Sequence, residues 1–262
     1  MKKQTKLALM LSAMMMIGSV NVYAAEAAPN QSKANTAKQA AAQKNTSVSI
    51  DGQIEEWSKK LKPGEVAAYY IANQSGNPLD RIQFISKGFV YDNYEEFLGK
   101  AEVMLAPSPT KPDTLPSGYQ YKSAILYLEN PAKTSDVYQK LEKQLKAEAS
   151  KGNKKVYFSK PFKADKADTA LLSYEKGKVK LDVVATHIQR SEPIGGTPVP
   201  IDNPDVTTET IVIHGVECTY TNNKKGRDYL EWIDEDHQVR YTIWAESAKW
   251  DVLSFAKKML AE

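Results

Sequence analysis

The chain has 262 residues, of which 42% are hydrophobic and 26% are charged, and both values are ordinary for a globular protein. They exclude a wholly disordered, collagenous or multi-span membrane chain, and the length allows one large domain or two small ones. The formal charge of +3 comes from 35 basic and 32 acidic residues, but Lys2, Lys3 and Lys6 lie in a segment that we expect to be removed. Without those three lysines the charges balance, so no excess of positive charge points to nucleic acid as a partner.

Residues 1–24 have the pattern of a secretory signal peptide. A short cationic stretch ends at Lys6, an apolar run extends from Leu7 to Val20, and a small-x-small pattern ends at Ala24. We expect cleavage after Ala24, with Ala27 as the second choice and an uncleaved N-terminal anchor as the alternative. A lipoprotein anchor would need a cysteine at the cleavage point, whereas the single cysteine is Cys218. The pattern predicts a secreted, extracellular protein with no stable membrane span after cleavage.

Residues 25–46 are rich in Ala, Gln, Asn and Lys and contain no aromatic residue. Such a composition cannot bury enough apolar surface to offset the entropy of the chain, so a disordered leader is expected. It is either a solvated spacer or, because it is mildly cationic, a tether to an anionic cell wall.

Residues 47–105 are expected to form an N-terminal α+β segment. The patterns predict strands at 47–50, 65–72 and 81–86 and an amphipathic helix over 53–61. Asp92 and Glu95 have the spacing of a capping box, and the helix behind them would present Tyr94, Phe97, Leu98 and Ala101 on one face. Residues 106–118 contain four prolines and are predicted to be an extended connector, which either joins two parts of one unit or separates two lobes.

Residues 119–262 are expected to form a C-terminal α+β domain. Strands are predicted at 119–128, 154–159, 170–174, 178–187 and 209–221, with a hairpin of 228–233 and 239–245 and a long surface loop over 191–204. One helix is capped by Ser135 and presents Val137, Tyr138, Leu141 and Leu145. The last is capped by Ser247 and presents Val252, Phe255, Ala256, Met259 and Leu260. Eight to ten short strands, roughly, and three or four helices indicate an α+β fold with a curved antiparallel sheet and helices on one face.

Catalytic and metal-binding motifs are missing from the sequence. His187, His214 and His237 do not have the spacing of zinc ligands, and the acidic run at 234–236 has no EF-hand pattern. Cys218 lies in a strand-like run and is interpreted as a small buried apolar residue, with a nucleophilic role beside His214 as the alternative. We therefore expect a protein that is not an enzyme and that uses no cofactor and no metal.

Aromatic residues cluster on the last predicted hairpin and are the candidate binding residues. They are Trp232, Tyr241 and Trp244. Strand alternation places Tyr241 and Ile243 on one face and Trp244 on the other. One face must be core, and the other is predicted to be a ligand groove on the concave side of the sheet. The alternative is that these aromatics fill the interface between helix and sheet.

The order of several short motifs resembles a known family. The run Leu115–Tyr119 is followed by strands like 170–174 and 180–185, then by motifs at 211–215, 230–232 and 241–243, and by a helix like 252–260. This pattern resembles an uncharacterised C-terminal domain family, a domain of unknown function in exported and anti-sigma-factor-like proteins of Gram-positive bacteria. It is similar in layout to lipoprotein-carrier and sigma-regulator sensor folds. The resemblance implies a half barrel in which a bent sheet wraps a helix and holds an apolar ligand, and it implies no catalytic residues. Residues 50–57 separately resemble the opening of some secreted carbohydrate-binding sandwiches.

These observations lead to one main hypothesis about function. The chain is expected to be a secreted, non-catalytic binding or sensor-like protein of the cell envelope that holds an apolar ligand or a protein segment on a concave sheet. The alternatives are a cell-wall or glycan-active hydrolase, which would need a pair of pocket carboxylates, a carbohydrate-binding module, and a structural component of the envelope.

Overall fold

A computed structural model describes residues 49–72, 76–188, 204–246 and 249–261. The predicted signal peptide, the leader, most of the loop over 191–204 and the Ser247 cap lie outside the described residues. The described residues all belong to one compact unit of the chain.

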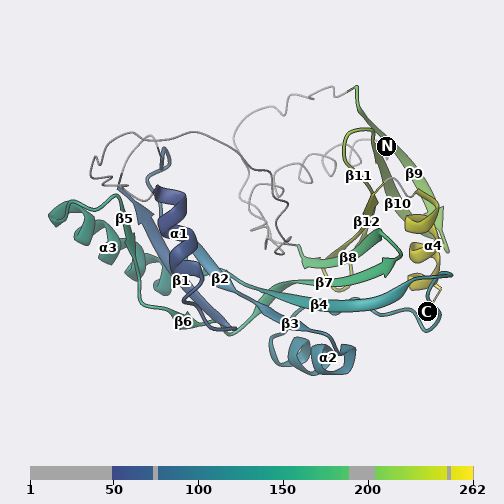
Figure 1. Ribbon diagram of the computed structural model, residues 1–262, viewed down its shortest axis with the longest axis horizontal. Helices are drawn as coiled ribbons and strands as arrows, with labels where there is room; N and C mark the ends of the chain where they lie inside the picture. Colours follow the sequence, from purple (N-terminus) through teal and green to yellow (C-terminus); the bar gives the residue numbers. More distant parts are fainter. Residues whose placement is uncertain (1–48, 73–75, 189–203, 247–248, 262) are drawn as a thin grey trace, which may run out of the picture. The chain divides into compact units, whose positions relative to one another are not determined.

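The first part of the chain builds a small antiparallel sheet. Its strands are β1 (Glu65–Ile71), β2 (Gln83–Lys87), β5 (Val156–Phe158) and β6 (Phe162–Lys163), in the order β2-β1-β5 with β6 also beside β1. Helix α1 (Ile50–Ser58) packs against Ala67, Tyr69 and Ile71, and α3 (Asp136–Lys151) packs against the alternate residue Ala68. Because side chains alternate along a strand, the two helices cover opposite faces of this sheet (Figure 1).

The start of α1 corrects the strand predicted at 47–50. Ile50 is the first residue of the helix, and the Ser49 hydroxyl caps it by accepting a hydrogen bond from the Gly52 N–H at 3.1 Å. Serine and the following Asp51 both favour a helix N-terminus, and this local preference outweighs the short alternation of apolar residues. Residues 50–57 are therefore helical, whereas the opening of a β-sandwich would be a strand.

The larger sheet contains eight strands and is antiparallel at each pairing. Its order is β3-β4-β7-β8-β12-β11-β10-β9. The strands are β3 (Phe89–Tyr91), β4 (Gln120–Leu128), β7 (Ala167–Lys176), β8 (Val179–His187), β9 (Val206–Ile213), β10 (Val216–Asn223), β11 (Arg227–Asp234) and β12 (Val239–Glu246). The predicted α+β class is confirmed, with four helices and twelve strands among the described residues.

The single strand predicted over 209–221 is wrong, because the structure has a hairpin there. Strand β9 ends at Ile213, strand β10 begins at Val216, and these two residues are partners in the register. His214 and Gly215 between them have φ values of 49° and 86°. Two successive residues with positive φ make the tight turn that the right-handed twist of a hairpin favours, and glycine adopts this conformation without a Cβ clash.

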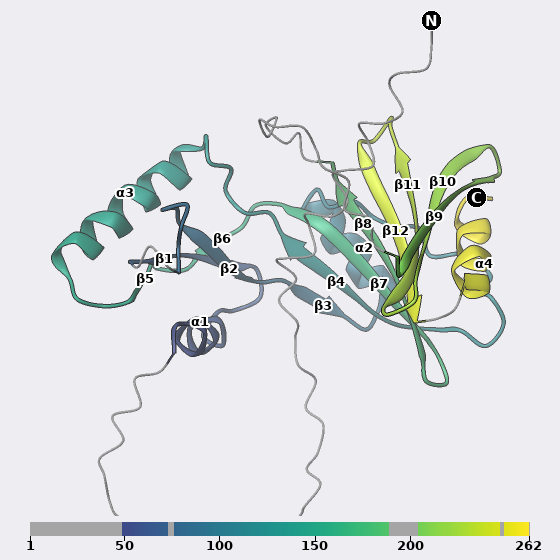
Figure 2. The same cartoon turned by 90° about the horizontal axis from the view of Figure 1, so that it is seen from above.

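Helices α2 (Tyr94–Val103) and α4 (Lys249–Met259) supply side chains to the core of the larger sheet. Phe97 and Ala101 of α2 and Val252, Phe255 and Ala256 of α4 are buried as predicted. In α3, Tyr138 and Leu145 are buried, but Val137 is 49% exposed and does not belong to the packed face. Figure 2 shows α4 beside strands β9–β12.

The cap of α2 also differs from the prediction. The N-cap is Asn93, whose Oδ1 accepts hydrogen bonds from the N–H groups of Glu95 and Glu96 at 2.8 and 3.1 Å. Asp92, the predicted cap, lies one residue too early to reach these donors.

Both sheets take strands from each side of the segment 106–118. Strand β3 precedes it and pairs with β4, whereas β5 and β6 follow it and pair with β1. The segment contains no helix or strand, in agreement with its four prolines. It runs from α2, which packs on the larger sheet, to β4 of that sheet, and therefore does not separate one sheet from the other.

Candidate functional site

The two faces of the larger sheet differ in their packing. On the first face, buried residues such as Tyr174, Leu181 and Ile243 form one cluster with α2 and α4. On the second face, the central side chains are neither buried nor fully exposed. This second face is defined by Thr169, Leu171, Ser173, Asp182, Val184, Thr186, Tyr229, Glu231, Ile233, Arg240, Thr242 and Trp244, which are cross-strand neighbours in the register.

The three candidate aromatic residues lie on different faces. Trp232 and Tyr241 are cross-strand partners whose rings stack at a centroid distance of 5.1 Å, and both belong to the core of the first face. Trp244 lies on the second face, as the alternation predicted. The pair thus occupies the interface between helices and sheet, which was the alternative interpretation, and Trp244 is the member of the trio that a ligand on the second face could meet.

Asp182 contacts several polar and charged side chains around the second face. Its carboxylate accepts hydrogen bonds from the Ser173 hydroxyl at 2.7 Å and from the Trp244 indole N–H at 3.1 Å. The Arg227 guanidinium lies 3.5 Å from the same carboxylate and 5.7 Å from the centroid of the Trp244 ring. The Asp182 side chain is 17% exposed. These charge-assisted contacts fix the orientation of the indole, so the sheet presents a rigid aromatic surface flanked by a cation.

Glu231 is a second acidic group on this face. It accepts a hydrogen bond from the Thr242 hydroxyl at 3.3 Å. Burial raises the pKa of its carboxyl group, against the opposing effects of Arg240 and of the Thr242 hydrogen bond. The second face therefore combines hydroxyl groups, ionisable groups and apolar side chains.

The carboxyl group of Asp168 has a pKa that is raised more than that of Glu231, but Asp168 is not one of the residues of the second face. It is the extra residue at a bulge between β4 and β7, where Tyr127 pairs with Thr169 and Leu128 with Ala167. The pKa of Asp168 is raised to about 6, mainly by burial and also by Glu129, against the opposing effects of hydrogen bonds and His187. Neither Asp168 nor Glu231 influences the pKa of the other.

The remaining chemically reactive residues are accounted for by local structure. Cys218 is fully buried, and this burial raises the pKa of its thiol to about 11, so the interpretation as a buried apolar residue is confirmed. His214 lies in the turn between β9 and β10, and His237 pairs with Asp234 at 2.8 Å on the tip of the β11–β12 hairpin. Within the described ranges, no group of His, Cys, Asp and Glu residues is arranged to hold a metal ion.

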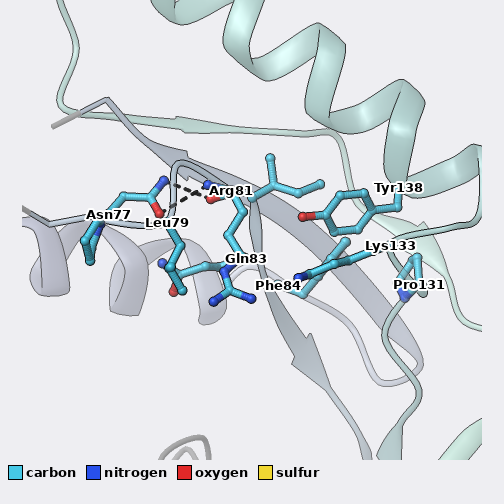
Figure 3. A pocket seen from close by; sticks show the side chains of 10 residues that line it. Asn77, Leu79, Arg81, Gln83, Phe84, Pro131, Lys133 and Tyr138 are labelled. Atoms are coloured by element: carbon cyan, nitrogen blue, oxygen red, sulfur yellow. Dashed lines mark hydrogen bonds between the residues drawn. The ribbon is translucent and has the colours of Figure 1, made fainter. Parts of the chain in front are cut away.

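A groove of about 450 Å³ lies on the smaller sheet. Its lining residues are Asn77, Pro78, Leu79, Arg81, Ile82, Gln83, Phe84, Pro131, Lys133 and Tyr138, which come from β2 and its preceding turn, from the approach to α3 and from α3 itself (Figure 3). The sequence pattern does not reveal this groove, because three separate segments build it. The sequence feature that could have pointed to the groove is the cationic residue Arg81 just before the apolar strand β2.

Searches of protein-family models, curated proteins and solved structures found no match to this chain. Among the described residues, no helix is both long and apolar enough to span a bilayer.

Proposed function

We propose that this chain is a secreted, non-catalytic binding or sensor-like protein of the cell envelope, and that it holds a protein segment on the second face of the larger sheet. In this proposal the larger sheet curves with the second face as its concave side. Because α2 and α4 pack on the first face, the sheet would not wrap a helix as the half barrel implied by the resemblance does. The chain would then belong with the exported domains of unknown function that its C-terminal motifs resemble.

The observation that carries the proposal is the fixed position of Trp244 at one end of a half-buried face. An indole that is hydrogen-bonded to Asp182 and flanked by Arg227 offers contact area at little cost in conformational entropy. The central residues of this face are half-buried although α2 and α4 pack on the first face. Such partial burial is expected where a sheet curves around its own side chains.

The chemistry of the face favours a protein segment over a purely apolar ligand. Leu171, Val184 and Trp244 can contact apolar side chains, whereas Ser173, Thr186 and Thr242 can form hydrogen bonds. Asp182 and Glu231 are already partly buried and hydrogen-bonded by the protein, and a lipid chain over this surface would remove their remaining water without offering a hydrogen bond in its place, which is costly. A peptide offers both apolar and hydrogen-bonding groups.

The hydrolase alternative has weaker support from the described residues. It needs two carboxyl groups in one cavity, one of them with a raised pKa. The raised groups, Asp168 and Glu231, do not act on one another, and no carboxylate lines the groove on the smaller sheet.

Peptide display tests the binding proposal. The purified full chain is used to select twelve-residue peptides from a random library, and their affinities are then measured by fluorescence polarisation. Replacing Thr242 with arginine places a long charged side chain in the middle of the second face. We expect Thr242→Arg to weaken the selected peptides at least about tenfold, which corresponds to ~1.4 kcal/mol.

A matched control separates the effect of position from that of charge. Gln139→Arg makes the same addition on the exposed surface of α3 and should leave affinity unchanged. Circular dichroism confirms that both variants are folded. If no peptide is enriched, or if Thr242→Arg binds as wild type does, the proposed function is wrong.

Export is tested independently of binding. A C-terminally tagged full-length chain, produced in a Gram-positive host, is expected in the culture medium with Ala25 as its first residue. A tagged protein that stays inside the cell with an intact N-terminus would contradict this part of the proposal.

A further inference from the structure

The groove on the smaller sheet is lined by positive charge alone. Its lining includes two cations, Arg81 and Lys133, and no Asp or Glu. Within the part of the chain that the structure describes, neither cation forms an ion pair or a side-chain hydrogen bond. Figure 3 shows their charged ends directed into the same part of the groove. The neighbouring acid, Asp80, is already bound by the Tyr70 hydroxyl at 2.6 Å and by the Lys146 ammonium at 3.0 Å.

The rest of the lining is apolar, with a further donor. Ile82 and the Tyr138 ring are buried, Phe84 is half-buried, and Leu79 at the edge is 64% exposed. The Tyr138 hydroxyl forms no hydrogen bond to another described residue, and Figure 3 shows it pointing along the groove toward Arg81. Leu79 and Phe84 therefore present accessible apolar surface beside three donors, two of them cationic.

The edge of the groove is held in place before any ligand binds. Asn77 is 4% exposed, and its side chain binds both polar groups of the Arg81 backbone: Nδ2 donates to the carbonyl at 2.8 Å, and Oδ1 accepts from the N–H at 3.3 Å. Phe84 and Tyr138, whose ring centroids are 5.9 Å apart, hold the other side. Preformed sites lose less entropy on binding than sites that a ligand must organise.

We propose that this groove binds a small amphiphilic carboxylate, whose head lies between Arg81 and Lys133 and whose apolar body lies along Leu79, Ile82 and Phe84. The Arg81 guanidinium and the Lys133 ammonium supply charge-assisted hydrogen bonds to the carboxylate. A volume of about 450 Å³ is within the range of small-molecule sites and accommodates a medium-length acyl chain. This site lies on the smaller sheet, so it does not depend on peptide binding at the second face.

Calorimetry with decanoate tests the proposal on the purified full chain. Decanoate is expected to bind with a dissociation constant below about 1 mM. Acetate, which has the head without the apolar body, and decyltrimethylammonium, which has the opposite charge, are expected not to bind in that range. Amide chemical-shift changes caused by decanoate should be confined to residues 77–84 and 131–138. Equal binding of decanoate and decyltrimethylammonium, or shift changes located elsewhere, would overturn the proposal.

Variants distinguish the two parts of the ligand. Arg81→Gln and Lys133→Gln should each weaken decanoate about five- to tenfold through the loss of a charge-assisted hydrogen bond. Leu79→Ser should weaken it about threefold by removing apolar contact. Lys140→Gln, which removes an exposed cation from α3 away from the groove, is the matched control and should bind as wild type does. If the Arg81 and Lys133 variants also bind as wild type does, the assignment of the head group is wrong.

Discussion

Asp168, the extra residue at the bulge between β4 and β7, has a carboxyl group whose pKa is raised well above the ordinary value for an aspartate. Burial is the main cause of the rise in its pKa to about 6, because the charged form loses hydration that the hydrogen bonds at the bulge replace only in part. The charged and polar groups that act on it are Glu129, Thr169 and His187. In the unfolded chain an aspartate has a pKa of about 3.9.

This difference predicts a specific dependence of stability on pH. Between pH 4 and pH 6 the folded state holds a proton on Asp168 that the unfolded state has released. The stability from this group is therefore full below about pH 4, falls as the pH rises, and is lost above about pH 6. Asp168→Asn removes the titration, so the free energy of unfolding of the variant should gain roughly 2 kcal/mol relative to wild type between pH 4 and pH 7.

Urea denaturation of both proteins at several pH values measures the difference. Asp165→Asn, at an exposed position in the same segment, is the control and should track wild type at all pH values. A constant difference between Asp168→Asn and wild type across this range would show that Asp168 is already ionised in the folded protein.

The start of α2 depends on which of two neighbouring residues caps the helix. Two adjacent polar residues, Asp92 and Asn93, are both good caps, and the structure uses the second, whose Oδ1 meets two backbone N–H groups. Asn93→Ala should therefore reduce the free energy of unfolding by about 1 kcal/mol, because two donors of the first helical turn lose their acceptor.

Asp92→Ala provides the comparison one residue earlier. This side chain is exposed and accepts no hydrogen bond from the helix N–H groups, so its removal should change stability by less than about 0.5 kcal/mol. Thermal or urea unfolding measures both variants. The reverse order, with the greater loss at Asp92, would restore the capping box inferred from the sequence.

Elements with long and regular patterns were predictable from the sequence. The stripe of α4, the alternation of β8 and the hairpin of β11 and β12 all agree with the structure, because many residues repeat the same signal. The β9–β10 hairpin was missed because its turn has only two residues, His214 and Gly215, inside one continuous apolar run. A tight turn of this kind is defined by backbone conformation, which the composition of the apolar run does not reveal.

The candidate sites were less predictable than the elements. Alternation placed Trp244 on the face opposite Tyr241, but nothing in the sequence paired Trp244 with Asp182, since that contact depends on the register of β12 against β8. The groove depends on long-range packing in the same way, with Arg81 and Tyr138 more than fifty positions apart in the chain.

The two sheets are connected by a very short piece of chain, and they contribute side chains to the same hydrophobic cluster. One hydrophobic cluster contains Val66 of β1 together with Phe97 of α2 and Leu126 of β4. The chain passes from β2 to β3, and so from the smaller sheet to the larger one, through the single residue Gly88. A Cβ at Gly88 would lie 2.1 Å from the carbonyl oxygen of Leu126, in the backbone of the neighbouring strand.

Gly88→Ala should therefore destabilise the protein by about 3 kcal/mol or more, because the clash is with a strand backbone that cannot rotate away as a side chain can. Gly99→Ala makes the same chemical change inside α2, where a Cβ would meet nothing within 4 Å, and it should stabilise the protein by roughly 0.5 to 1 kcal/mol. Urea unfolding of the two variants beside wild type measures both signs. If Gly88→Ala were as stable as wild type, β3 would not approach β4 as closely as the structure has it, and the joint between the two sheets would have to be placed elsewhere. Because Gly99→Ala differs only in position, its stabilisation would show that the loss at Gly88 comes from the close approach of the strands and not from alanine itself.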